Sequence, residues 1–125
     1  MEKQGNLKLL TKIADFYRDI LPVLKKFPKD QRYTLAQRIE ERVLSCAEMV
    51  YFIAYQKRNR AERLEELRVR LHFLGLLVRL SNEQKFLSDK QYEVFSLRLI
   101  EMGRITSKWI QTEFSRKSEN AKTSV

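Results

Sequence analysis

Arginine side chains carry the clearest chemical signal in this sequence. Arg60, Arg63 and Arg70 recur at spacings that place them on roughly one face of a helix, and Arg104 lies one turn before Lys108. A guanidinium group binds phosphate or carboxylate oxygens through two parallel hydrogen bonds, which an ammonium group cannot do. We therefore expect these five residues to contact the phosphates of a nucleic acid, with a charged subunit interface as the alternative.

The overall charge also favours an anionic partner. Twenty-five Lys and Arg stand against sixteen Asp and Glu, which gives a net charge of +9. An excess of this size favours a polyanion such as nucleic acid, although a generally solvated basic surface is the alternative. The sequence has no zinc-finger, RNP or helix-turn-helix signature, so we expect binding to depend on shape and charge and to show little base preference.

Residue types that serve catalysis or metal binding do not form a recognisable motif. His72 has no Ser or Cys nucleophile placed beside it by a known motif, the three glycines are isolated from one another, and the Glu-x-x-His pattern of di-metal bundles does not occur. Cys46 lies inside an apolar helical pattern, which is typical of a core residue. We expect no catalytic residue, no cofactor and no metal site.

The composition predicts one all-α domain. Three glycines and two prolines leave little turn chemistry for β-hairpins, and an apolar fraction of 43% in 125 residues is enough for one hydrophobic core. Apolar runs stay far below the roughly 20 residues that cross a bilayer, and the start of the chain lacks a secretion signal. These features lead us to expect a cytoplasmic protein with no membrane contact.

Four helical patterns follow one another along the chain. The first spans about residues 6–26. Asp30 is the predicted N-cap of the second, which extends to about residue 56, and Asn59 is the predicted cap of the third, which ends in a polar stretch at 81–85. Ser88 and Gln91 form a capping box that opens the fourth helix, which ends near residue 114.

Long amphipathic helices with short connections pack most economically as an antiparallel up-down-up-down four-helix bundle. We assign residues 1–115 to this bundle and residues 116–125 to a polar, disordered tail, and we expect Pro22 to kink the first helix. The predicted apolar stripes are Leu7, Leu10, Ile13, Ala14, Tyr17, Ile20, Leu21 and Leu24; Ala36, Ile39, Val43, Cys46, Val50 and Ile53; Leu64, Leu67, Leu71, Leu74 and Val78; and Tyr92, Phe95, Leu99, Met102, Thr106 and Trp109.

Further apolar residues on the third and fourth helices lie outside these narrow stripes. They are Leu76, Leu77, Leu97, Ile100, Ile105 and Ile110. Exposed apolar residues usually mark subunit contacts, so we expect a homo-oligomer. Trp109 is expected to anchor the core or this interface, and Gly103 would let another helix approach closely.

Two regions of the sequence resemble the Avd proteins, accessory subunits of the reverse transcriptases in diversity-generating retroelements. Residues 27–35, FPKDQRYTL, resemble the helix-opening signature of that family. Residues 87–92, LSDKQY, and 101–104, EMGR, followed by Trp109 and Ile110, resemble its fourth helix. With the matching helix lengths, the resemblance covers about residues 7–112.

The resemblance implies a four-helix protomer that assembles into a basic pentameric barrel. It also implies a non-enzymatic role in a complex with reverse transcriptase and template RNA, or RNA/DNA, during mutagenic reverse transcription. Arg32 of the signature opposes the helix dipole, which suggests a compensating carboxylate on the fourth helix or on a neighbouring subunit. Two alternatives stay open: a standalone RNA-binding bundle of the type encoded in ribosomal intervening sequences, and a structural oligomeric adaptor.

Overall fold

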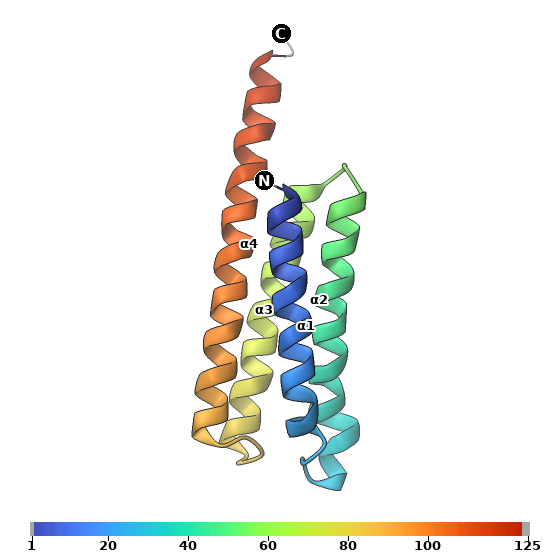
Figure 1. Ribbon diagram of the computed structural model, residues 1–125, viewed down its shortest axis with the longest axis vertical. Coiled ribbons are helices and arrows are strands. Elements are labelled where there is room, and N and C mark those ends of the chain that lie inside the picture. The colour runs from blue at the N-terminus through green and yellow to red at the C-terminus, as the bar shows by residue number, and fades with distance from the viewer. Residues whose placement is uncertain (1, 124–125) are drawn as a thin grey trace.

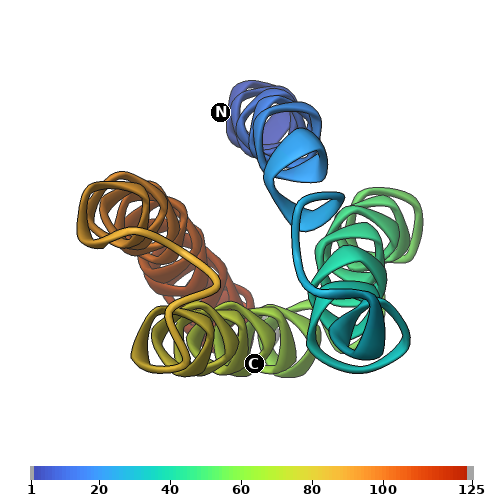
Figure 2. The same ribbon diagram turned by 90° about the horizontal axis from the view of Figure 1, so that it is seen from below.

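The protein is an antiparallel bundle of four long helices. The computed structural model describes the backbone of residues 2–123 and the side chains of residues 6–119. The helices are α1 (Glu2–Leu24), α2 (Gln37–Tyr55), α3 (Arg60–Glu83) and α4 (Asp89–Thr123), and they run alternately down and up (Figure 1). Each helix packs against the next in the chain and α1 also packs against α4, so the four form a closed ring in the end-on view (Figure 2). The predicted all-α up-down-up-down fold is confirmed.

The core consists of one apolar stripe from each helix. All predicted core residues of α2 and α3 are buried, and so are Phe95, Leu99, Met102, Thr106 and Trp109 of α4. Cys46 also lies in this core, where burial raises the pKa of its thiol to about 12. Burial of these stripes supplies most of the favourable free energy of folding, because helical propensity alone stabilises helices of this length only marginally.

The stripe predicted for α1 is partly out of phase. Leu7 and Ala14 are exposed, whereas Leu9 and Phe16, which the prediction omits, are completely buried. The Phe16 ring packs edge-on against Phe95 with 5.3 Å between centroids. The helix carries enough apolar residues to offer two overlapping stripes, and contact with α4 selects the one that contains the larger aromatic side chain.

The connection between α1 and α2 is tighter than predicted. The chain forms a 3₁₀ turn over Lys29–Gln31 and a π-helical turn over Arg32–Ala36 before α2 begins at Gln37. Asp30 therefore lies inside the 3₁₀ turn, and its predicted role as N-cap of α2 is wrong. Pro28 lacks an amide hydrogen, and the bond from the Gln31 amide to the Pro28 carbonyl (2.8 Å) starts the tight turn that displaces the cap.

The starts of α3 and α4 agree better with the sequence. Asn59 is the N-cap residue of α3 and adopts a left-handed conformation with φ 59°, although its side chain makes no capping hydrogen bond. The capping box before α4 is confirmed: the Gln91 amide donates to Ser88 Oγ (3.1 Å), and the Ser88 amide donates to the Gln91 side-chain oxygen (2.9 Å).

The C-terminal helix is longer than predicted. α4 continues through Arg116 to Thr123 and projects beyond the other helices (Figure 1), in place of the disordered tail expected from residue 116. Two ion pairs stabilise this added part of the helix. Arg116 lies 4.0 Å from Glu113 one turn earlier, and Lys117 lies 3.5 Å from Glu62 of α3. The last two residues of that predicted tail lie outside the described part of the chain.

Among the described residues, every helix is too polar or too short to cross a bilayer.

Candidate nucleic-acid interface

Arg60, the first residue of α3, contacts the end of α2 and the side of α4. Its Nε donates to the Gln56 carbonyl (3.0 Å) and its Nη2 to the Ala54 carbonyl (3.2 Å), both at the end of α2. Its Nη1 lies 3.7 Å from Oε1 of Glu113 on α4. The side chain is only 15% exposed. These contacts give Arg60 a structural role at this end of the bundle and leave little of its guanidinium accessible to a phosphate.

Arg70 and Arg63 also face α2. Arg70 donates through Nη1 to the Ser45 carbonyl of α2 (3.2 Å) and through Nη2 to Glu66 (2.9 Å). The Arg63 guanidinium lies 5.5 Å from the ring centroid of Phe52, and its buried Nε finds no acceptor among the residues that the structure describes. The three arginines do share one face, as predicted, but that face is the seam between α2 and α3.

Arg104 and Lys108 are placed differently. Both are exposed on α4, and within residues 6–119 neither forms an ion pair. They border a groove of about 1000 Å³ between α3 and α4. Of the five arginines and lysines predicted to bind phosphate, these two keep their full hydrogen-bonding capacity toward solvent, which is the condition for neutralising a phosphate.

The floor of this groove, which we call the α3/α4 groove, is apolar. It includes Leu76, Ile100, Ile105 and the two helical glycines Gly75 and Gly103. Leu76 and Ile100 are exposed and Ile105 is half-buried. An apolar floor with basic borders is a surface that a helix or another subunit would cover.

The other predicted interface residues separate into three environments. Leu77 and Ile110 are buried inside the protomer, so their prediction as surplus surface residues is wrong. Leu97 is exposed but does not line the groove, and Trp109 is buried in the core. Arg32 is exposed in the π-helical turn, and no carboxylate of the described residues pairs with it.

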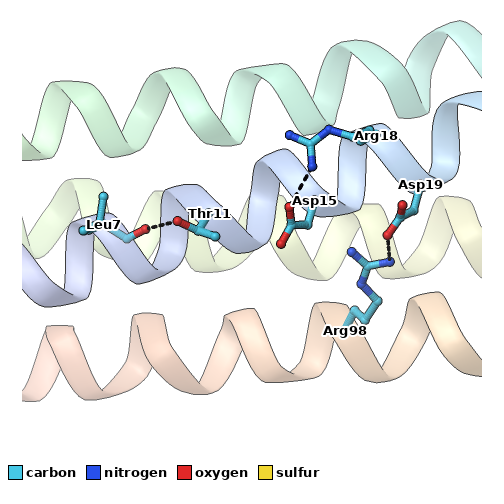
Figure 3. A network of polar contacts seen from close by, with 6 residues as sticks. All are labelled: Leu7, Thr11, Asp15, Arg18, Asp19 and Arg98. Atoms are coloured by element: carbon cyan, nitrogen blue, oxygen red, sulfur yellow. Dashed lines mark hydrogen bonds and ion pairs between the residues drawn. The ribbon is translucent and has the colours of Figure 1, made fainter.

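The contact between α1 and α4 depends on charged residues that sequence patterns did not identify. Arg98 of α4 donates to Asp19 of α1 (2.9 Å), as Figure 3 shows beside the local Arg18–Asp15 and Thr11–Leu7 contacts of α1. The Arg98 guanidinium also lies 5.5 Å from the ring centroid of Phe16. No spacing rule within one helix reveals such a pair, because its members are 79 residues apart.

A second ion pair joins the same two helices. Lys12 of α1 lies 2.8 Å from Glu101 of α4. Its hydrogen bond lowers the pKa of the Glu101 carboxyl. On the other side of α1, the Tyr17 hydroxyl donates to Glu40 of α2 (3.0 Å), and this bond raises the pKa of the tyrosine. Polar contacts thus fix α1 against both of its neighbours.

Sites for other chemistry are not evident in the described part of the chain. Its His, Cys, Asp and Glu side chains do not form a group of three or more that would hold a metal ion. His72 is exposed and lines the α3/α4 groove. The surface of α4 instead presents two exposed cations, Arg104 and Lys108, beside the apolar α3/α4 groove. This combination suits the binding of a macromolecule.

Comparison with known proteins gives one match. A family model described as bAvd-like matches residues 7–113, a range that includes most of α1 and α4 and all of α2 and α3. No curated protein and no solved structure matches the chain.

Proposed function

Because the chain belongs to the bAvd-like family, we propose that it is a non-enzymatic accessory subunit that binds a reverse transcriptase and its template RNA in a diversity-generating retroelement. The family supports the role in mutagenic reverse transcription. The surface that supports the RNA part of the proposal is the exposed pair Arg104 and Lys108, on a protomer with a net charge of +9. Assembly into a pentamer would multiply that charge and strengthen the attraction to RNA.

The RNA-binding surface is tested by charge reversal. We expect Arg104→Glu with Lys108→Glu to weaken binding of a single-stranded RNA, measured by fluorescence anisotropy at several salt concentrations. If each side chain neutralises one phosphate, the log–log salt slope should decrease in magnitude by about 1.4. Lys25→Glu with Lys26→Glu is the matched control, because both lysines are exposed directly after the end of α1 and the change in net charge is the same.

The outcomes separate the functions. Equal effects of the two double variants would show that net charge alone matters and that the α4 pair is not the phosphate site. A reverse-transcriptase gene beside the gene of this protein is the first expectation of the accessory role, and co-purification with the encoded enzyme tests that role directly. A protein that binds RNA but never the enzyme would be a standalone RNA-binding bundle. One that binds neither would contradict the proposal.

The α3/α4 groove supports the proposed homo-oligomer. Light scattering should give a mass near five times the 15.0 kDa of the protomer. Leu76→Glu should reduce that mass, because it places a charge on the exposed apolar floor. Leu97→Glu is the control outside the groove. A monomeric parent protein would contradict the pentamer.

A further inference from the structure

The outer face of α2 ends in a group of exposed aromatic side chains. Tyr51, Phe52 and Tyr55 are 53%, 43% and 82% exposed. The rings of Tyr51 and Tyr55 are nearly parallel, with an interplanar angle of 5° and 6.4 Å between centroids. Large aromatic side chains are normally buried, so a parallel exposed pair is a surface that suits a flat ligand.

Basic residues lie at the C-terminal end of this aromatic group and beside it on α3. Lys57 and Arg58 follow Tyr55 in the α2–α3 connection, both are exposed, and neither pairs with a carboxylate of the described residues. Arg63 of α3 lies over the Phe52 ring. Lys57 also lines a polar pocket of about 540 Å³, whose other charged lining residues are Arg60, Glu62, Glu113, Arg116 and Lys117. Arg60, Arg116 and Lys117 pair with the two carboxylates of this pocket, so Lys57 and Arg58 are the cations beside the aromatic group that can meet a phosphate.

The arrangement favours a nucleic acid over an apolar protein surface as the ligand. Glu48 stands between Leu44 and Tyr51 along the outer face of α2, so the apolar area does not extend down the helix. Parallel rings beside cations suit a single-stranded nucleic acid, because its bases stack on aromatic faces and its phosphates attract Lys and Arg. Stacking of this kind tolerates any base.

We propose that Tyr51 and Tyr55 form a stacking platform for the bases of single-stranded nucleic acid, whose phosphates lie against Lys57 and Arg58. The inference rests on the proposed function in one respect, that nucleic acid is a ligand of this protein. The platform is separate from the Arg104 and Lys108 surface, since α2 and α4 occupy opposite corners of the bundle (Figure 2).

The test compares variants that remove stacking with variants that remove charge. Binding of a labelled oligouridine RNA is measured by anisotropy across a salt series. Tyr51→Ala with Tyr55→Ala should weaken binding at least about tenfold with little change in salt slope, because stacking releases no counterions. Lys57→Ala with Arg58→Ala should instead decrease the magnitude of the slope by about 1.4. Tyr33→Ala is the matched control, since Tyr33 is 84% exposed in the connection between α1 and α2, at the other end of the bundle.

An abasic strand of the same length provides the second comparison. The parent protein should bind it more weakly than the oligouridine, and the double tyrosine variant should bind both strands alike. If that variant keeps the parent's affinity for oligouridine, the platform is wrong while the proposed function stands. If it keeps that affinity and loses oligomeric mass, the aromatic group is a subunit contact, which also overturns the inference. A parent protein that binds no RNA overturns both proposals.

Discussion

Arg60 should matter for stability and not for RNA affinity, although its residue type predicts the opposite. Replacing it with alanine removes the hydrogen bonds to the Gln56 and Ala54 carbonyls and the ion pair with Glu113. Hydrogen bonds to a charged group contribute about 1.5–3 kcal/mol each, and the two bonds of Arg60 lie at or below the lower end of that range because one is exposed and the other only partly buried. The 3.7 Å ion pair adds little, because Arg116 lies 4.0 Å from the same carboxylate oxygen. We therefore expect Arg60→Ala to lower the free energy of unfolding by about 2–3 kcal/mol.

Urea unfolding followed by circular dichroism measures this loss. Parent and variant must be compared at one protein concentration, because dissociation of an assembly is coupled to unfolding. Arg58→Ala is the control, since an exposed side chain two residues away should change stability by no more than about 0.5 kcal/mol. If Arg60→Ala is as stable as Arg58→Ala and binds RNA less tightly than the parent, Arg60 contacts the ligand and its structural role is refuted.

Three further predictions concern the folded protomer. Phe16→Ala should cost roughly 3–5 kcal/mol in urea unfolding, because it empties a fully buried site and removes the contact with Phe95; a loss below 1 kcal/mol would contradict the packing. Ser88→Ala should cost about 1 kcal/mol through loss of the capping box, and Gln91→Ala less, so the reverse order would contradict the box geometry. Cys46 keeps its proton in the folded state up to a pKa of about 12 against an ordinary 9.0, so stability should fall above pH 9 by roughly 1.4 kcal/mol per pH unit. Tyr17 adds to that loss of stability above its ordinary pKa of 10.0. In thermal unfolding between pH 8 and 10.5, the stability of Cys46→Ala should fall less steeply with pH than that of the parent. Identical slopes of stability against pH would refute the contribution of the thiol.

Sequence patterns locate a buried stripe correctly where charged residues flank its apolar positions. In the first half of α3 the leucines recur at spacings of three and four residues and charged residues occupy most of the positions between them, so the stripe is well defined there before Leu76 and Leu77 widen it. In α1, Leu7 and Leu9 begin two different stripes, and the choice between them depends on where Phe95 lies in α4. Information of that kind comes from a contact between distant segments and is absent from local spacing.

The arginines show the same limit for the candidate site. Their spacing predicts a shared face, and the structure has one. Whether that face meets solvent or a neighbouring helix depends on the rotation of α3 about its own axis. The apolar stripe determines this rotation only within a broad angle. The carbonyls that accept from Arg60 and Arg70 belong to α2, and backbone acceptors carry no signature in a sequence. The Tyr51 and Tyr55 pair, in contrast, was visible in principle as two aromatics one helical turn apart.

The two glycines of the α3/α4 groove keep the protomer below the stability that its fold permits. A methyl group added at Gly75 or Gly103 would meet no atom within 4 Å, so alanine fits both positions. Each glycine inside a helix is about 0.5–1 kcal/mol less stable than alanine. Selection for folding of the isolated chain would favour the replacement. A helix that lies along the groove reverses this preference, because it can approach a bare backbone more closely than a methyl group allows. Glycine at these two positions would then lower the stability of the protomer and strengthen its association with the second helix.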